Sequence, residues 1–206
     1  GTGSSLNFIS TENYTWSFWM KVDGGSEFSV QGVLGKAESN VKGYGITYLD
    51  GAKRMVFNSY NGLAVLSTNA ITNPENWHHY AFTYANGNVT LYQDGALDKS
   101  AVKVFFSDTS SPFTLGFAIS RSEYYLNGSL DDVMMFNRSL SASEIASLYN
   151  ATANQYYNNF TGLSGGAHTM KGNMPPFFGN TTEAKAIAEY IYPFLDHRPL
   201  AQIYGL

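Results

Sequence analysis

Two adjacent carboxylates, Asp131 and Asp132, are the first residues whose types and spacing could do chemistry, in the stretch GSLDDVMMFNR over 128–138. A carboxylate pair can act as general acid and base, or it can bind a hard cation such as calcium. Successive side chains of a strand point to opposite faces, so these two cannot act on one substrate atom. Two interpretations remain: a calcium ligand at the rim of a sheet, or a side chain that bonds to backbone N–H groups where the strand ends.

Two adjacent histidines, His78 and His79, are the second candidate for chemistry. In a strand they alternate in direction, with one packed inward beside Trp77 and the other directed outward. Catalysis or metal binding needs partner groups that converge on a ring nitrogen, and the sequence shows none. We therefore expect a structural role for both histidines.

Exposed aromatic rings are the third candidate, because amphipathic rings suit contacts at a wet interface. The three tryptophans are core candidates, and Trp19 is the one that we expect to be exposed and able to stack on a sugar ring. The segment 120–128 is a candidate ligand-binding loop, and it carries Arg121, Glu123, Tyr124 and Tyr125. The alternative is that these side chains only pack in the core or at its rim.

Short runs with strand character must position these side chains. They occur at 14–22, 32–37, 44–60, 62–68, 76–100, 113–118 and 128–138. Strong hairpin or turn signals interrupt the longer runs at Asp50-Gly51, Asn86-Gly87 and Asp94-Gly95. The spacing is typical of an all-β antiparallel sandwich.

One short helix follows the last strand-like run. Ser141 and Glu144 form a capping box, and Leu140 can pack on Ile145 as a hydrophobic staple. The apolar positions that follow predict about two helical turns. Residues 1–150 are then one domain, with a polar, Gly-rich linker over 151–180 and a C-terminal helix and tail over 181–206.

Composition excludes several classes of protein. The chain has 206 residues with 16% aromatic and only 14% charged side chains, and its net charge is −4 without a basic stripe, which argues against nucleic acid as a partner. The absence of cysteine excludes disulfides, thiolate metal sites and covalent haem. No apolar run is long enough to span a membrane. The opening GTGSSLNFIS carries no signal peptide, so we expect a mature or excised chain.

Asn-x-Ser/Thr sequons occur seven times, which is more than the composition predicts by chance. Such sites favour a glycosylated protein outside the cell or at its surface, although an Asn- and Ser-rich composition is the alternative explanation. The candidate sites are Asn13, Asn88, Asn127, Asn137, Asn150, Asn159 and Asn180.

Three stretches together resemble the laminin-G-like, concanavalin-A-like jelly-roll family: YTWSFWMKV, NWHHYAFTYANGNVTLYQDG and GSLDDVMMFNRSLSASEIASLY. They stand in the family's order and cover about 13–150. The resemblance implies a jelly-roll sandwich and, in many members, calcium at the rim, for which Asp131 and Asp132 are the candidates. Family members usually open with a strand that precedes residue 1, so we expect an open N-terminal edge suited to strand addition.

The same fold hosts glycoside hydrolases, which need two carboxylates across a cleft. When these carboxylates lie on one strand, they usually form the sequence pattern Glu-x-Asp-x-(x)-Glu. The eight glutamates of this chain do not follow that pattern. We therefore expect no enzyme activity, although a fold alone does not decide function.

The tail has a second resemblance, to the haem-proximal and C-terminal region of c-type cytochromes. The stretch HTMKGNMPPFFGN would follow the haem-binding motif, but Ser164 and Ala167 stand where its cysteines would be. The conceivable iron ligands that remain are His168, Met174 and His197. A competing interpretation makes YYNNFTGLSGGAHT the start of another β module, and the sequence does not decide between the two.

Three functions therefore stay open. The first is a non-catalytic extracellular recognition or adhesion module that binds a glycan or a protein, with calcium as a candidate cofactor. The second is a structural subunit of a surface layer or filament that self-associates through its open edge or its tail. The third is a partner of electron-transfer cytochromes.

Overall fold

The computed structural model describes residues 11–25, 29–38, 42–59, 64–104, 107, 111–118 and 124–157. The chain divides into two units, Gly1–Ser164 and Gly165–Leu206, and all the described residues belong to the first. The linker beyond Tyr157, the C-terminal helix and the cytochrome-like tail therefore lie outside the described residues.

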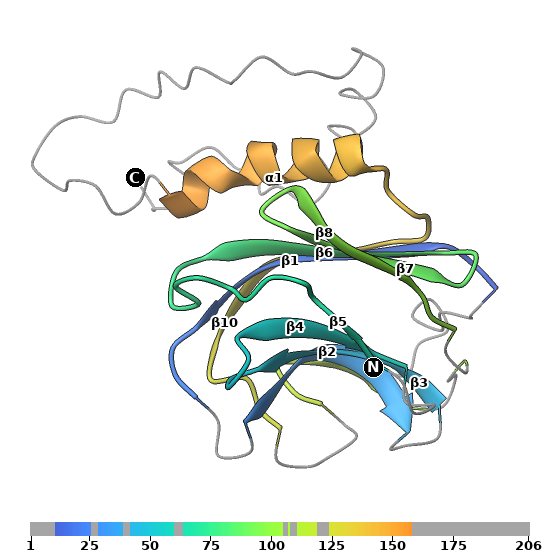
Figure 1. The fold of residues 1–206 in the computed structure, drawn as a ribbon, viewed down its shortest axis with the longest axis horizontal. Coiled ribbons are helices and arrows are strands. Elements are labelled where there is room, and N and C mark those ends of the chain that lie inside the picture. The colour runs from blue at the N-terminus through green and yellow to red at the C-terminus, as the bar shows by residue number, and fades with distance from the viewer. Residues whose placement is uncertain are drawn as a thin grey trace, which may run out of the picture. The chain divides into compact units, whose positions relative to one another are not determined.

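Two antiparallel five-stranded sheets form the domain, as the strand spacing predicts (Figure 1). The first sheet has the order β10-β1-β6-β7-β8, with strands Gly128–Phe136, Tyr14–Val22, His78–Ala85, Asn88–Gln93 and Ala96–Val102. The second has the order β5-β4-β3-β2-β9, with strands Ala64–Leu66, Arg54–Asn58, Lys42–Leu49, Val30–Glu38 and Phe113–Leu115. This arrangement confirms the predicted jelly-roll sandwich.

Aromatic side chains from both sheets fill the space between them. Alternate residues of β1 point inward, and the ring of Trp16 packs on Tyr44 of the opposite sheet with 4.8 Å between ring centroids. Phe18 stacks on Phe82 of the neighbouring strand at 6.2 Å. Burial of such large rings removes the most apolar area per residue from water, so this layer supplies most of the cohesion of the sandwich.

The helix α1, Ala142–Tyr157, lies across the outer face of the first sheet (Figure 1). Its start is the predicted capping box, because Ser141 N donates to Glu144 Oε2 at 2.8 Å and Glu144 N donates to Ser141 Oγ at 3.3 Å. Arg138 adds two bonds to the same carboxylate, at 2.6 and 3.0 Å. These bonds and the Arg138 charge lower the pKa of Glu144 to about 2.

The helix is longer than its sequence pattern predicts. The expected linker begins at 151, whereas residues 151–157 continue the helix. The physical reason lies in the sheet below, because Trp19 donates from Nε1 to Thr152 Oγ1 at 2.8 Å and thereby fixes the third turn. Within the part of the chain that the structure describes, no helix is both long and apolar enough to cross a membrane.

Candidate functional site

A loop on the edge of the second sheet carries the candidate site. The segment between β9 and β10 crosses β2 at Gly32, where an added Cβ would lie only 2.0 Å from Ala118 N. Tyr124 O accepts bonds from both Gly32 N at 3.1 Å and Ala118 N at 3.0 Å. Glycine is therefore required here so that the loop backbone can lie directly against the strand.

Tyr125 presents its ring from this loop to solvent. Its ring stacks on Phe117 with 4.9 Å between centroids and 27° between planes, and the two residues also form an isolated antiparallel bridge. The side chain remains 61% exposed, and nearby in sequence Leu115 at the end of β9 is 51% exposed. The result is a fixed aromatic surface with a polar hydroxyl at its edge, which is a suitable contact for the apolar face of a sugar ring.

Gln31 holds the rim beside this loop. Its buried side chain donates from Nε2 to Gly24 O at 2.8 Å and to Asp50 Oδ1 at 2.6 Å. Its Oε1 accepts from Asn127 N at 2.7 Å, two residues beyond Tyr125. One amide thus ties three loops together, so the rim is positioned before any ligand arrives.

Trp19 is not the exposed tryptophan, and that expectation is wrong. Its side chain is 0% exposed, because the ring lies under α1 and stacks on Tyr149 at 5.8 Å. Strand alternation does direct Trp19 away from the sandwich core, but the helix covers that face. Trp77 is the partly exposed tryptophan instead, with the Lys21 ammonium 6.0 Å from its ring centroid.

Of the other predicted ligand residues, Arg121 and Glu123 lie outside the described residues. Tyr124 is partly buried, and its backbone carbonyl holds the loop, so Tyr125 is the exposed ring of the described pair. Three other tyrosines are buried and cannot contribute a ring to a surface site: Tyr48 and Tyr84 in the core between the sheets, and Tyr92 outside that core.

Asp132 belongs to a β-bulge with Val133, and Asp131 directly precedes that bulge. Ser17 pairs with Met134 and Trp19 pairs with Asp131, so β10 carries one residue more than β1 between these points. Asp132 has φ +46°, and its N–H donates to Asp131 Oδ1 at 2.8 Å. The pair therefore does not follow simple strand alternation, and a calcium site at these residues stays a prediction. In the part of the chain that the structure describes, no three His, Asp or Glu side chains gather as a metal site.

His78 and His79 do have converging partners, contrary to the sequence prediction. His78 Nδ1 lies 2.8 Å from Asp94 Oδ2, while His79 Nε2 lies 2.8 Å from Ser17 Oγ. Asp94 does not orient the His79 ring, because its other oxygen accepts from the His79 backbone N–H at 3.0 Å. Ser17 and His79 are both fully buried, so these groups lack the geometry and access of a nucleophilic triad.

Burial decides the charge of the two histidines. Desolvation lowers the pKa of His79 to about 4, since no solvent reaches the ring beneath α1. Burial also opposes protonation of His78, but its bond to Asp94 outweighs that effect and raises the His78 pKa. His79 is thus neutral at physiological pH, and a structural role for both histidines stays a prediction.

The described sequons occupy surface positions with one partial exception. Asn13, Asn127, Asn137 and Asn150 are exposed, while Asn88 is half-buried and donates from Nδ2 to Ser100 Oγ at 2.7 Å. Asn159 and Asn180 lie outside the described residues. Glycosylation at these positions stays a prediction.

Comparison with solved structures finds the same fold in proteins with little sequence identity. The binding domain of Paraclostridial Mosquitocidal Protein 1 matches with a TM-score of 0.58 and 19% identity, over 74% of this chain and 40% of that chain. A sialidase of Trypanosoma rangeli in complex with the inhibitor DANA matches with a TM-score of 0.54 and 16% identity, over 67% and 22%. A proposed carbohydrate-binding protein of Bacteroides ovatus ATCC 8483 matches with a TM-score of 0.54 and 13% identity, over 68% and 41%.

This chain therefore spans less than half the length of each of these three chains. A search of curated protein sequences finds no significant match. A family model for the concanavalin A-like lectin/glucanases superfamily, of the laminin G type, matches residues 2–146. Since that match covers most of the chain and the sandwich has the corresponding architecture, this protein belongs to the laminin-G-type concanavalin A-like family.

Proposed function

We propose that this protein is a non-catalytic module that recognises a carbohydrate through the loop that carries Tyr125. The observation that carries this proposal is the Tyr125 ring, 61% exposed and stacked on Phe117. The family supports it, as do similar solved structures described as a binding domain and as a proposed carbohydrate-binding protein. Absence of enzyme activity is part of the proposal, since the glutamates of this chain do not follow the Glu-x-Asp-x-(x)-Glu pattern expected of a glycoside hydrolase with this fold.

A glycan array tests the proposal, with the Tyr125→Ala variant beside the wild type. Because ring stacking on a sugar face supplies about 1 kcal/mol or more, we expect roughly tenfold weaker binding by Tyr125→Ala. Leu97→Ala is the matched control, because Leu97 is 63% exposed on β8, far from this loop in the sheet order. Equal binding by the wild type and Tyr125→Ala would remove the loop from the proposed site.

Calcium dependence and an extracellular location are finer parts of the same proposal. The array is repeated with a calcium chelator and with Asp131→Asn, whose side chain is exposed beside the bulge. We expect both treatments to weaken binding if the Asp131 carboxylate holds a calcium ion that takes part in recognition, because hard cations prefer oxygen ligands. Unchanged binding under chelation would exclude calcium as a cofactor of recognition.

A further inference from the structure

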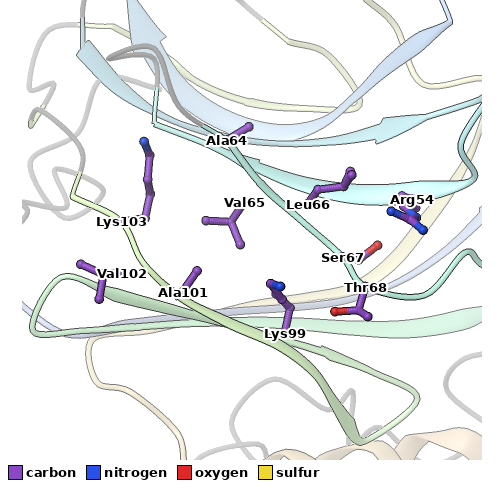
Figure 2. A pocket seen from close by; sticks show the side chains of 10 residues that line it. All are labelled: Arg54, Ala64, Val65, Leu66, Ser67, Thr68, Lys99, Ala101, Val102 and Lys103. Carbon is purple, nitrogen blue, oxygen red and sulfur yellow. The ribbon is translucent and has the colours of Figure 1, made fainter.

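A pocket of about 510 Å³ opens between the edge strands of the two sheets, β5 and β8 (Figure 2). Its lining comes from the start of β4, from β5 and the residues after it, and from the second half of β8 and the residue after it. The volume lies within the range of roughly 300–1,000 Å³ that is typical of small-molecule sites. The opening is separate from the Tyr125 loop, since that loop packs on β2 near the opposite edge of the second sheet.

The pocket has an apolar base that continues the sandwich core. Val65 is 5% exposed, and Ala101 pairs with the buried Val89, so Ala101 lies on the inner face of its sheet. Lys99 pairs with the buried Leu91, so its side chain leaves the strand on the same side, at the open edge of the sandwich where the residue is exposed. Lys99 therefore places a cation at the mouth of the pocket, next to the apolar base formed by Val65 and Ala101.

Three cationic side chains line the pocket: Arg54, Lys99 and Lys103. They are a quarter of the chain's twelve lysines and arginines, in a protein whose net charge is −4. None of the ten lining residues is acidic, and no side-chain hydrogen bond or ion pair joins these cations to another described residue. Figure 2 shows the ammonium groups of Lys99 and Lys103 extending from the β8 side toward the strands of the other sheet.

Lys103 is the most enclosed of these cations. The residue is 7% exposed, and burial lowers its pKa, so the protein holds a charge there at some expense in solvation. An anion placed in the pocket would compensate that loss, because opposite charge favours the protonated form of a lysine.

The adjacent acid, Asp98, is occupied elsewhere. It is the extra residue of a bulge in β8, and its carboxylate accepts from Thr68 N at 2.7 Å, Asn69 N at 3.0 Å and Asn69 Nδ2 at 2.8 Å. These bonds join β8 of one sheet to the residues that follow β5 of the other. These bonds fix the distance between the two sheet edges beside the pocket. They also engage the Asp98 carboxylate with the loop after β5, so that it does not form an ion pair with Lys99.

We propose that this edge pocket binds the anionic group of an acidic saccharide, a carboxylate or a sulfate, with the sugar ring against the apolar base. Two basic side chains from one sheet and one from the other would surround the anion, while Val65 and Ala101 would contact the ring. The proposal rests on the proposed function only in taking the ligand to be a sugar, and it assigns a second site independent of Tyr125.

Isothermal titration of the full chain tests the pocket with four probes. These are a disaccharide that contains a uronic acid, a sulfated disaccharide, a neutral disaccharide and sodium sulfate, each at low and at high salt. We expect an acidic disaccharide to bind at least tenfold more tightly than the neutral one, with the difference reduced by salt. Binding of sodium sulfate without any acidic disaccharide, or equal affinity for the neutral one, would overturn the assignment of an acidic saccharide.

Variants of the cations locate the binding. Lys99→Gln and Arg54→Gln should each weaken binding of the acidic disaccharide by about five- to tenfold, since each removes one charge from the lining. Lys53→Gln is the matched control, because Lys53 is exposed, precedes Arg54 and does not line the pocket. An equal loss in Lys53→Gln would mean a general charge effect and would refute the pocket.

Two further outcomes separate this proposal from the Tyr125 loop. Binding of acidic disaccharides that Lys99→Gln weakens and Tyr125→Ala does not would support the pocket even if the loop bound nothing. No binding of any probe, together with self-association of Lys99→Gln, would overturn it and identify the cations as groups that keep the sheet edges from pairing with other chains.

Discussion

At the scale of single residues, glycine and tyrosine together determine the candidate site. Tyr125 is exposed on a loop that packs on β2, and that close approach depends on the missing Cβ of Gly32. The sequence GVLG by itself predicts a strand in which the glycines contribute little to packing. The role of Gly32 becomes evident only in the structure, where Ala118 lies beside it.

Gly32→Ala should destabilise the protein by about 3 kcal/mol or more, because the new Cβ would lie 2.0 Å from a backbone nitrogen that cannot move independently. Gly51→Ala is the matched control, since a Cβ there would meet nothing within 4 Å. That change should leave the free energy of unfolding within about 0.5 kcal/mol of the wild type. Urea denaturation measures both, and equal stability of the two variants would show that the loop does not pack on β2 as described.

At the scale of elements, α1 covers the outer face of the first sheet, and the side chains between them form a second buried layer. Tyr149 stacks on Trp19, and the Cβ of an alanine at position 95 would lie 2.9 Å from the Tyr149 ring. The Asp94-Gly95 turn, with φ of +49° and +76°, therefore serves both as the hairpin turn and as a seat for the helix. The turn was evident from the dipeptide, whereas its contact with α1 was not.

Ser141→Ala should lower the free energy of unfolding by about 1 kcal/mol, because it removes the side-chain acceptor for the Glu144 backbone N–H. Ser147→Ala is the control on the same helix, since its hydroxyl only bonds back to Ser143 O at 2.8 Å. That control should be neutral or slightly stabilising. Thermal denaturation of both variants checks the prediction, and an equal loss in both would mean that the cap does not limit helix stability.

At the scale of the whole molecule, the buried His79 predicts how stability depends on pH. The unfolded chain protonates this histidine near pH 6.5, whereas the folded protein resists until about pH 4. Stability is therefore complete above pH 6.5 and is lost as pH falls from 6.5 toward 4, by up to about 3 kcal/mol. Urea denaturation between pH 7 and 4 should show this loss, and it should be much smaller in His79→Gln.

Two other groups provide controls for the pH experiment. The raised pKa of His78 gives the opposite sign, because its contribution is complete below 6.5 and is lost as pH rises through the folded pKa, so His78→Gln should keep the acid loss. Glu144 contributes stability that is present above pH 4.5 and is lost only as pH falls toward 2. A wild-type loss between 6.5 and 4 that survives in His79→Gln would contradict the assignment.

The sequence by itself determined the architecture of this protein, because strand periodicity, turn dipeptides and a capping box are local signals. Trp16 and Phe18 alternate toward the core, Asp94-Gly95 turns the chain, and Ser141 with Glu144 begins α1 as predicted. Local signals report which way a side chain leaves the backbone and where an element starts.

Only the tertiary structure decided which side chains remain accessible. The periodicity of β1 directs Trp19 outward, and α1 then buries it, while Tyr125 stays exposed because no described element covers its loop. The basic edge pocket likewise joins residues about 45 positions apart, from β4 and β8. Accessibility and charge clustering depend on what other segments place nearby, so no spacing within one strand can specify them.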